Sequence, residues 1–286
     1  MAEKEMNSFK LCLPDRLEIS AAEYHGYPAA SSGQLKRLLR SPAHYKHELQ
    51  NPTPPTGAQN LGWLIHLAVL EPDVFHESTV VIPKFEGRGA RSRAEEWEKE
   101  HAGKHVVKSS EMQIIKGVLK SLSSHRTARE LLASGHFENS FFWQDPVTGL
   151  VCKCRPDLWR EGLVVDIKTT LNASPQEFPR TIANMMYHLQ GAFYMDGVSA
   201  VLGEPIERFL ILAVEKTPPY AVATYTLDEA TLDVGRMFYR RALRVLRQCK
   251  MRNHYPGYPD RIISTSLPSW AWPVETEESD FAVRAV

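Results

Sequence analysis

The sequence between residues 149 and 168 constrains the fold most, because two strand-like segments follow each other with almost no connection. Residues 149–159 and 163–168 are predicted strands, and Glu161-Gly162 forms the tight turn that joins them. Such a turn makes the two strands neighbours in a sheet. Side chains alternate along a strand, so Asp166 and Lys168 share one face, and Asp157 is expected beside Asp166.

Two carboxylates with one ammonium beside them favour metal-dependent chemistry on a phosphodiester. Close like charges raise the pKa of a carboxyl group unless a cation neutralises them. Mg²⁺ or Mn²⁺ prefers oxygen ligands, and either ion would supply that charge and activate a water molecule. The alternative is an ordinary ion pair on a solvated strand, either Asp166 with Lys168 or Asp157 with Arg155.

Two further patterns favour a functional site over simple ion pairs. Tyr187, Gln190 and Tyr194 are spaced so that they lie on one face of a helix. Gly62-x-x-x-His66 lies on an otherwise apolar helix, although a single histidine in such a place is more often a hydrogen-bonded core residue.

The whole chain is predicted to be a single α/β domain, in which helices flank a mixed β-sheet. Helices are expected from residue 31, over 58–70 and over most of 93–134, with a loop at 80–93. The later elements are strands 137–144, 206–215 and 221–227 and helices 179–196 and 228–249. We expect one domain over 1–272, with a helical part at 31–134, a catalytic core at 137–227 and a disordered acidic tail at 273–286.

The composition is that of a soluble protein with balanced charge. The 34 basic and 34 acidic residues argue against a nucleic-acid partner unless the basic residues are segregated. The longest apolar run, Phe209 to Val214, is too short to cross a bilayer, and no secretory signal is visible. These features predict a cytoplasmic protein that does not associate with membranes.

The four cysteines, Cys12, Cys152, Cys154 and Cys249, match neither a disulfide framework nor a zinc site. Cys152 and Cys154 lie two apart on a predicted strand, so they are expected to pack against a helix as small hydrophobic residues.

Taken together, these motifs resemble the PD-(D/E)xK nuclease superfamily. They occur in the order GxxxH, ExSxx[YW], PD, DxK and QxxxY. The resemblance is to the RecB-like and lambda-exonuclease-like branch, and within it to RecE-type exodeoxyribonuclease VIII. Segments such as SSGQLKRLLRSPAHYK, CKCRPDLW, YHLQGAFYMDG and SLPSWA carry the finer similarity, which spans residues 31–270. It implies a restriction-endonuclease-like core.

The resemblance also implies a role for each motif residue. Asp157, Asp166 and the Ile167 carbonyl would bind Mg²⁺ or Mn²⁺, with two ions per active site and His66 as a ligand of the second ion. Lys168 would orient the attacking water and stabilise developing charge. The remaining motif residues would hold metal-bound water (Glu138) and orient Lys168 and the phosphate (Gln190 and Tyr194). Relatives with an iron–sulfur cluster have a Cys-Pro pair where this chain has Ser41-Pro42, so no such cluster is expected.

The activity implied is 5′→3′ exonuclease action on the ends of linear double-stranded DNA, releasing mononucleotides and leaving 3′ single strands. The implied assembly is a ring-shaped homo-oligomer, a tetramer rather than a trimer, and the implied partner is a single-strand annealing protein of the RecT type. Two alternatives remain: a Cas4-like or RecB-like nuclease acting on single-stranded DNA, and a nuclease-fold DNA-binding subunit without hydrolysis.

Basic residues suggest where DNA would lie. A late helix carries four arginines on one stripe, which could follow phosphates or could be an ordinary solvated face: Arg236, Arg240, Arg244 and Arg247. Ser32, Arg37 and Arg40 cluster near a helix N-terminus and are candidates for a 5′-terminal phosphate. Arg155, on the strand face of Asp157, is a further DNA-contact candidate.

Overall fold

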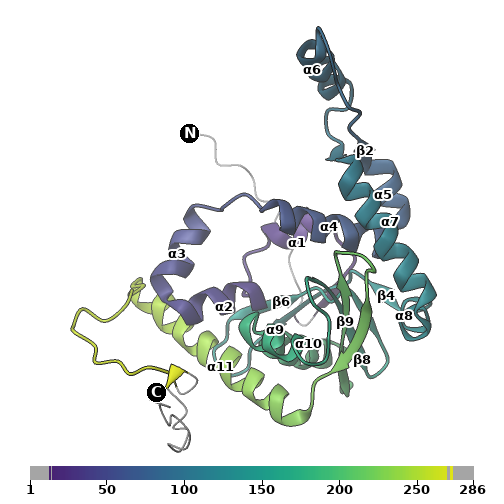
Figure 1. Ribbon diagram of the computed structural model, residues 1–286. Helices are drawn as coiled ribbons and strands as arrows, with labels where there is room; N and C mark the ends of the chain where they lie inside the picture. Colours follow the sequence, from purple (N-terminus) through teal and green to yellow (C-terminus); the bar gives the residue numbers. More distant parts are fainter. Residues whose placement is uncertain (1–12, 14, 269–270, 273–286) are drawn as a thin grey trace, which may run out of the picture.

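A computed structural model describes residues 13, 15–268 and 271–272 of the chain. At its centre is a five-stranded sheet in the order β10 (Val222–Thr226), β9 (Arg208–Glu215), β8 (Leu163–Thr170), β7 (Leu158–Arg160) and β4 (His136–Phe137). Strands β8 and β9 are parallel, and the other neighbours are antiparallel. The sheet is therefore mixed, as the sequence predicted (Figure 1).

A second sheet has three strands, two of which are continuous in the chain with strands of the first sheet. It has the order β1 (Asp15–Leu17), β5 (Ser140–Gln144) and β6 (Val151–Cys154). The expected strands 137–144 and 149–159 are each broken in two, so that one long hairpin bends from one sheet into the other. At the bend Glu138 has a φ of 52°, and its N–H donates to the carbonyl of Asp157 at 3.2 Å. Asp157 thus lies in the break between β6 and β7 and not within a continuous strand.

Helices cover both faces of the five-stranded sheet. One layer contains α2 (Ser32–Arg40), α9 (Phe178–Asn184), α10 (Tyr187–Leu202) and α11 (Glu229–Arg252), and packs on Val164, Ile211 and Ala213. The other contains α4 (Gly57–Leu70), α7 (Ser109–Ser124) and α8 (Arg126–Leu132), and packs on Val165, Ile167 and Leu212. Because β8 and β9 are covered on both sides, β9 is apolar except at its two ends, whereas β8 is apolar from Leu163 to Val165 and then carries Asp166 and Lys168.

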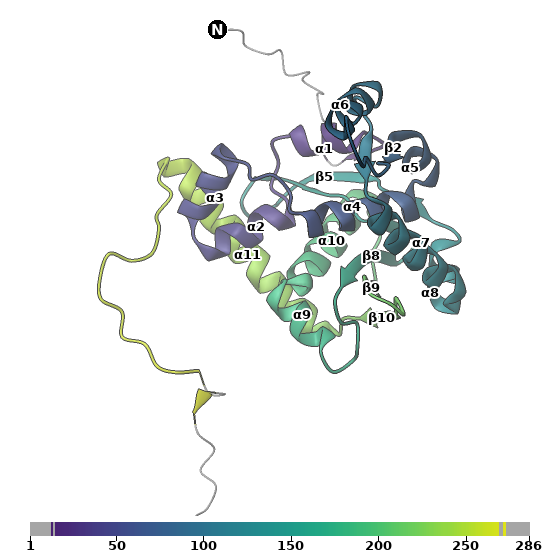
Figure 2. The same cartoon turned by 45° about the horizontal axis from the view of Figure 1, so that its top comes forward.

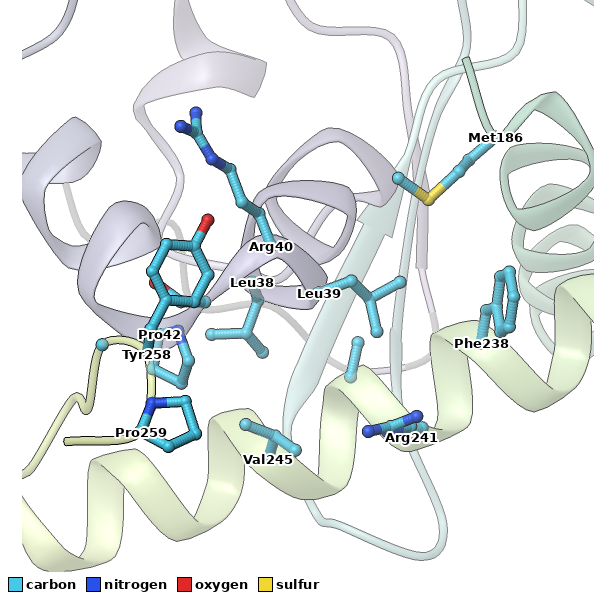
Figure 3. A pocket seen from close by; sticks show the side chains of 13 residues that line it. Leu38, Leu39, Arg40, Pro42, Met186, Phe238, Arg241, Val245, Tyr258 and Pro259 are labelled. Atoms are coloured by element: carbon cyan, nitrogen blue, oxygen red, sulfur yellow. The ribbon is translucent and has the colours of Figure 1, made fainter. Parts of the chain in front are cut away.

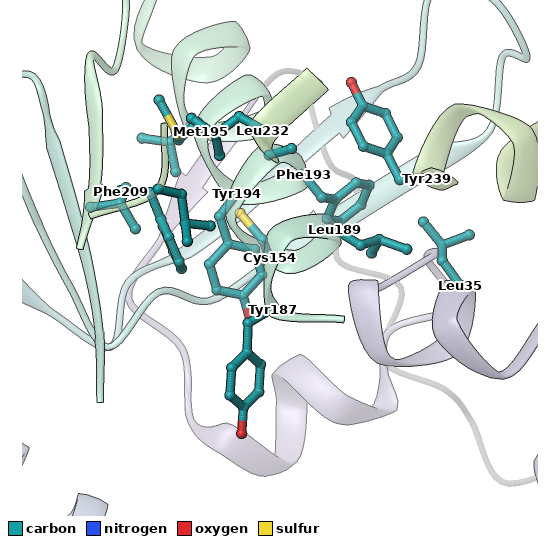
Figure 4. Packing of buried hydrophobic residues seen from close by; sticks show 14 of the residues in the cluster. Leu35, Cys154, Tyr187, Leu189, Phe193, Tyr194, Met195, Phe209, Leu232 and Tyr239 are labelled. Atoms are coloured by element: carbon teal, nitrogen blue, oxygen red, sulfur yellow. The ribbon is translucent and has the colours of Figure 1, made fainter. Parts of the chain in front are cut away.

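The first of these layers contains a core of large side chains. Figure 4 shows Leu35 of α2, Leu189 and Phe193 of α10 and Tyr239 of α11 meeting there. Helices α10 and α11 approach closely at Gly235, where a Cβ atom would lie 2.2 Å from the carbonyl oxygen of His188. Cys152 and Cys154 are fully buried in the same core, which confirms their prediction as small hydrophobic residues; Cys12 lies outside the described residues.

Two predicted helices differ from the structure. The expected helix 179–196 is split at Met186, which has a left-handed φ of 49°, and α10 continues to Leu202. The region 93–134 is interrupted, because α6 (Ala90–Glu100) begins inside the expected loop and β3 (His105–Val107) separates it from α7. Strand β3 pairs with β2 (Thr79–Val81), which follows α5 (Pro72–Ser78), and α6 lies at the end of this projecting arm (Figure 1).

Two short helices complete the N-terminal part: α1 (Ala21–Gly26) and α3 (Pro42–Gln50). The segment after α11 runs away from the helices (Figure 2), and the predicted acidic tail 273–286 lies outside the described residues. No helix in the described part of the chain is both long enough and apolar enough to cross a membrane.

Candidate active site

Asp166 lies on β8, Asp157 immediately precedes the neighbouring strand β7, and both are buried. Leu158 of β7 pairs with Val165 of β8, which brings the preceding Asp157 alongside Asp166. The backbone N–H of Ile167 donates to Asp157 Oδ2 at 2.5 Å and fixes this carboxylate against β8. Asp157 is 8% exposed and Asp166 is 2% exposed, so the two carboxylates lie close together with little water around them.

Lys168 and Gln190 hold the second carboxylate. The Lys168 ammonium forms an ion pair with Asp166 Oδ2, a buried atom. Gln190 Nε2, on α10, donates to Asp166 Oδ1 at 2.9 Å. The structure therefore brings the predicted Asp157, Asp166, Lys168 and Gln190 into one cluster.

The environment separates the pKa values of the two carboxyl groups. Burial raises the pKa of Asp166, and the charge of Asp157 adds to this effect while Lys168 opposes it. Burial also acts to raise the pKa of Asp157, but His66, Lys168 and the Ile167 N–H outweigh it and hold that pKa below its ordinary value. Burial would lower the pKa of Lys168, yet the two aspartates raise it, so the ammonium stays charged.

His66 reaches the cluster because Gly62 lets its helix approach the sheet. A Cβ atom at Gly62 would lie 3.3 Å from Thr169 Oγ1 of β8, so the absent side chain sets the distance between α4 and that strand. One turn later His66 Nδ1 lies 3.4 Å from Asp157 Oδ1. Burial lowers the pKa of His66, but Asp157 raises it more, so the net shift is upward. The GxxxH motif thus contributes to the carboxylate cluster and is not an isolated core histidine.

Glu138 and Arg155 form a separate ion pair at the bend of the hairpin. Arg155 Nε donates to Glu138 Oε2 at 2.6 Å, and its Nη1 donates to the Ile19 carbonyl and to Ser140 Oγ. Arg155 is therefore occupied inside the fold, pairs with Glu138 and not with Asp157, and does not face a DNA surface. Burial, with the charge of Asp157, raises the pKa of Glu138 to about 7 although Arg155 opposes the shift.

Two tyrosines extend from the same side of α10 (Figure 4). Tyr194 is buried, and burial raises its pKa, with nearby Tyr24 and Asp166 adding to the effect. Tyr187 lies under two ammonium groups, those of Lys168 at 4.9 Å and Lys36 at 5.3 Å from its ring centre. Lys36, on α2, was not among the predicted site residues; it follows the apolar Leu35, and its position on the helix gave no signal of a role.

The donors at the cluster suit a small cation that prefers oxygen. No group of three or more His, Cys, Asp or Glu side chains within the described ranges forms a ready-made ligand set. Asp157, Asp166 and the Ile167 carbonyl nevertheless offer oxygen atoms, and Asp166 Oδ2 is buried in contact with the Lys168 ammonium. These atoms fit Mg²⁺ or Mn²⁺, the ions that PD-(D/E)xK nucleases typically use.

The predicted DNA-contact residues are more scattered. Arg236 pairs with Asp196, Glu229 and Asp233, so its charge is neutralised internally. The other three arginines of the stripe, Arg240, Arg244 and Arg247, are exposed, although Arg240 lies 3.6 Å from Asp196 and Arg247 donates to the Val147 carbonyl.

The three residues proposed for a terminal phosphate do not converge. Ser32 is buried, and Arg37 pairs with Glu48 of α3 at 2.8 Å. Arg40 lines a groove of about 460 Å³ between α2, α11 and the segment that follows α11, opposite Arg241 (Figure 3). None of the three touches the carboxylate cluster.

Residues 31–265 match the family described as "PDDEXK-like domain of unknown function (DUF3799)". The chain belongs to this family. It is therefore a member of the PD-(D/E)xK nuclease superfamily, and the observed helix-covered mixed sheet is the corresponding fold.

Solved structures agree with the fold. A crystal structure from Eubacterium rectale, named "Putative exonuclease", superposes with a TM-score of 0.58 at 14% identity, covering 88% of this chain and 97% of the other. A second structure, SSO0001, has a TM-score of 0.28 at 18% identity over 67% of this chain and 86% of the other, too low for any argument. No curated protein matches the chain.

Proposed function

We propose that this chain is a metal-dependent exodeoxyribonuclease of the RecE type, which degrades linear double-stranded DNA from its 5′ ends to mononucleotides. The observation that carries the proposal is the cluster of the buried Asp157 and Asp166 with the partly buried Lys168, at the adjacent strands β7 and β8, within a nuclease-superfamily fold. A binding subunit without hydrolysis has no use for two buried carboxylates whose charges must be compensated at a cost.

The clustered residues have different roles in the proposed hydrolysis. A divalent cation at Asp157, Asp166 and the Ile167 carbonyl would place positive charge against the phosphodiester and promote ionisation of water. Lys168 stays protonated and donates to the attacking water or to the phosphate oxygen that gains charge. Gln190 holds Asp166 in one orientation, and the Ile167 N–H does the same for Asp157.

Three parts of the proposal are supported by the motif resemblance alone: the action on duplex ends, the 5′→3′ direction and the oligomeric assembly. The proposed enzyme acts as a ring-shaped homo-oligomer, a tetramer, that encircles DNA, and a single-strand annealing protein of the RecT type receives the 3′ strands it exposes. A ring reconciles a net charge of zero with DNA binding, since basic residues can face the lumen and acidic residues the outside.

Linear duplex labelled at either the 5′ or the 3′ end tests the proposed activity. In Mg²⁺ we expect the 5′ label to be released first as a mononucleotide, and closed circular duplex of equal length to survive. Release of the label as short oligonucleotides from single-stranded DNA, with duplex untouched, would support the Cas4-like or RecB-like alternative. Light scattering of the same sample measures the assembly size.

Manganese is expected to support activity at least as well as magnesium. The reason is the proposed role of His66 as a ligand of the second ion, because an imidazole nitrogen is a softer ligand than Mg²⁺ prefers. The measurement is the initial rate at matched concentrations of the two ions. Activity in Mg²⁺ with none in Mn²⁺ would contradict this role for His66, and a His66→Gln variant should lose the Mn²⁺ advantage.

A further inference from the structure

Three carboxylates at the active site are each paired with a basic side chain, and one further basic side chain lies at the same cluster. Asp157 is matched by His66, Asp166 by Lys168 and Glu138 by Arg155. Lys36 also lies at this cluster, yet within the part of the chain that the structure describes it forms no ion pair with a carboxylate. An ammonium group that is partly buried without a counter-charge is unfavourable unless something else compensates it.

Lys36 is aimed into the site by two contacts. Its Nζ lies 3.3 Å from Gln190 Oε1, on the amide whose Nε2 binds Asp166, and 5.3 Å above the ring of Tyr187. Lys168 lies 4.9 Å from the same ring. An ammonium has three donors, and only one is used here, so Lys36 has hydrogen atoms to offer to a ligand on the side of the reacting groups.

We propose that Lys36 binds a phosphate group of the substrate, beside the same Tyr187 ring that Lys168 contacts. This inference rests on the proposed nuclease function and assigns a substrate contact to α2. The ligand is a phosphate oxygen anion, either the 5′-terminal phosphate of the DNA end or the phosphate being cleaved. Of the predicted terminal-phosphate residues on the same helix, Arg37 points to a different face and is paired with Glu48, and Arg40 lies one turn further on and lines the groove beside α11.

The affinity for phosphate should depend on pH. Burial, with the nearby charge of Lys168, lowers the pKa of Lys36 to about 7 in the ligand-free protein. Lys36 is therefore a cation below that pH and loses its charge above it. We expect phosphate affinity to fall as the pH rises through 7, and a bound phosphate to shift the loss to higher pH because it favours the charged form.

The experiment measures DNA binding with hydrolysis blocked by a chelator, using the full chain and duplex ends that carry either a 5′-phosphate or a 5′-hydroxyl. We expect Lys36→Met, which keeps the length and packing of the side chain, to weaken binding about tenfold. A loss confined to 5′-phosphorylated ends assigns Lys36 to the terminal phosphate. An equal loss on both ends assigns it to the phosphate being cleaved.

Two variants serve as controls. Lys36→Arg keeps the charge and should retain most of the affinity, without the decline above pH 7. Lys46→Met removes a lysine of α3 that likewise lies over a tyrosine ring, 5.0 Å from that of Tyr255, but outside the cluster, and should bind like wild type. Circular dichroism verifies that each variant is folded.

Binding by Lys36→Met within twofold of wild type on both ends would overturn the proposal. So would a variant that cleaves slowly but binds normally, since that result means Lys36 only positions Gln190. The nuclease proposal has its own test. If the wild-type protein binds 5′-phosphate through Lys36 and yet hydrolyses no DNA, the nuclease proposal is refuted and the phosphate-binding proposal is retained. A deoxynucleoside 5′-monophosphate, titrated by calorimetry, provides the same comparison without DNA.

Discussion

Replacing Asp166 with asparagine is expected to lower the rate of DNA hydrolysis by about 10³-fold or more, equivalent to roughly 4 kcal/mol of transition-state stabilisation. The substitution removes one of the two negative charges that would bind the cation, while the remaining side-chain oxygen can still accept the hydrogen bond from Gln190. The geometry is thus largely preserved and the charge is lost. The measurement is the release of acid-soluble nucleotide from linear duplex in Mg²⁺.

Two controls distinguish the loss of the negative charge from a loss of folding. Asp73→Asn makes the same chemical change at an exposed position of α5 and should leave the rate unchanged. The Asp166→Asn protein should also retain its circular dichroism spectrum, since burial raises the pKa of this carboxyl and so already disfavours its charged form. Full activity of Asp166→Asn would refute the proposed metal site.

Replacing Gly235 with alanine is expected to reduce the free energy of unfolding by about 3 kcal/mol. The added Cβ atom would lie 2.2 Å from the backbone oxygen of His188, and a backbone oxygen cannot rotate away as a side chain can. Helices α10 and α11 must therefore separate. Urea denaturation of the metal-free protein measures the loss, and the nuclease rate should fall as well because Gln190 follows His188 on α10.

Gly33→Ala is the matched control for this prediction. Gly33 lies within α2, and no atom comes within 4 Å of its added Cβ. Alanine there should leave the stability unchanged or increase it by up to about 1 kcal/mol, because glycine is the poorer helix former. Equal stability of the Gly235→Ala and Gly33→Ala proteins would show that α10 and α11 are not in close contact.

Local patterns were sufficient to predict the centre of the fold. The predicted turn is present: β7 ends at Arg160, β8 begins at Leu163, and Gly162 between them has the left-handed φ of 67° that such a turn requires. Adjacent strands joined by a tight turn leave little choice of register, so the proximity of Asp157 and Asp166 could be inferred without any knowledge of the rest of the chain.

Features that depend on distant segments could not be inferred in this way. The bend at Glu138 arises because the hairpin contributes strands to two sheets, and its alternating sequence pattern does not predict where it passes from one sheet to the other. The roles of α2 depend on which face meets α10, so the sequence identified the helix but not Lys36. Two partners of Arg236, Glu229 and Asp233, lie on its own helix and were within reach of sequence reasoning, whereas the third, Asp196, lies 40 residues earlier.

The Lys36–Gln190–Asp166 contacts and the His66–Asp157 contact also define the smallest piece of this protein that can work. Both contacts join the central sheet to helices α2 and α4, which lie nearly a hundred residues or more earlier in the chain. A fragment starting near residue 137 would contain Asp157, Asp166 and Lys168, yet lack His66, which pairs with Asp157, and Lys36, which contacts Gln190. Truncation studies should therefore retain the segment from residue 31 onward.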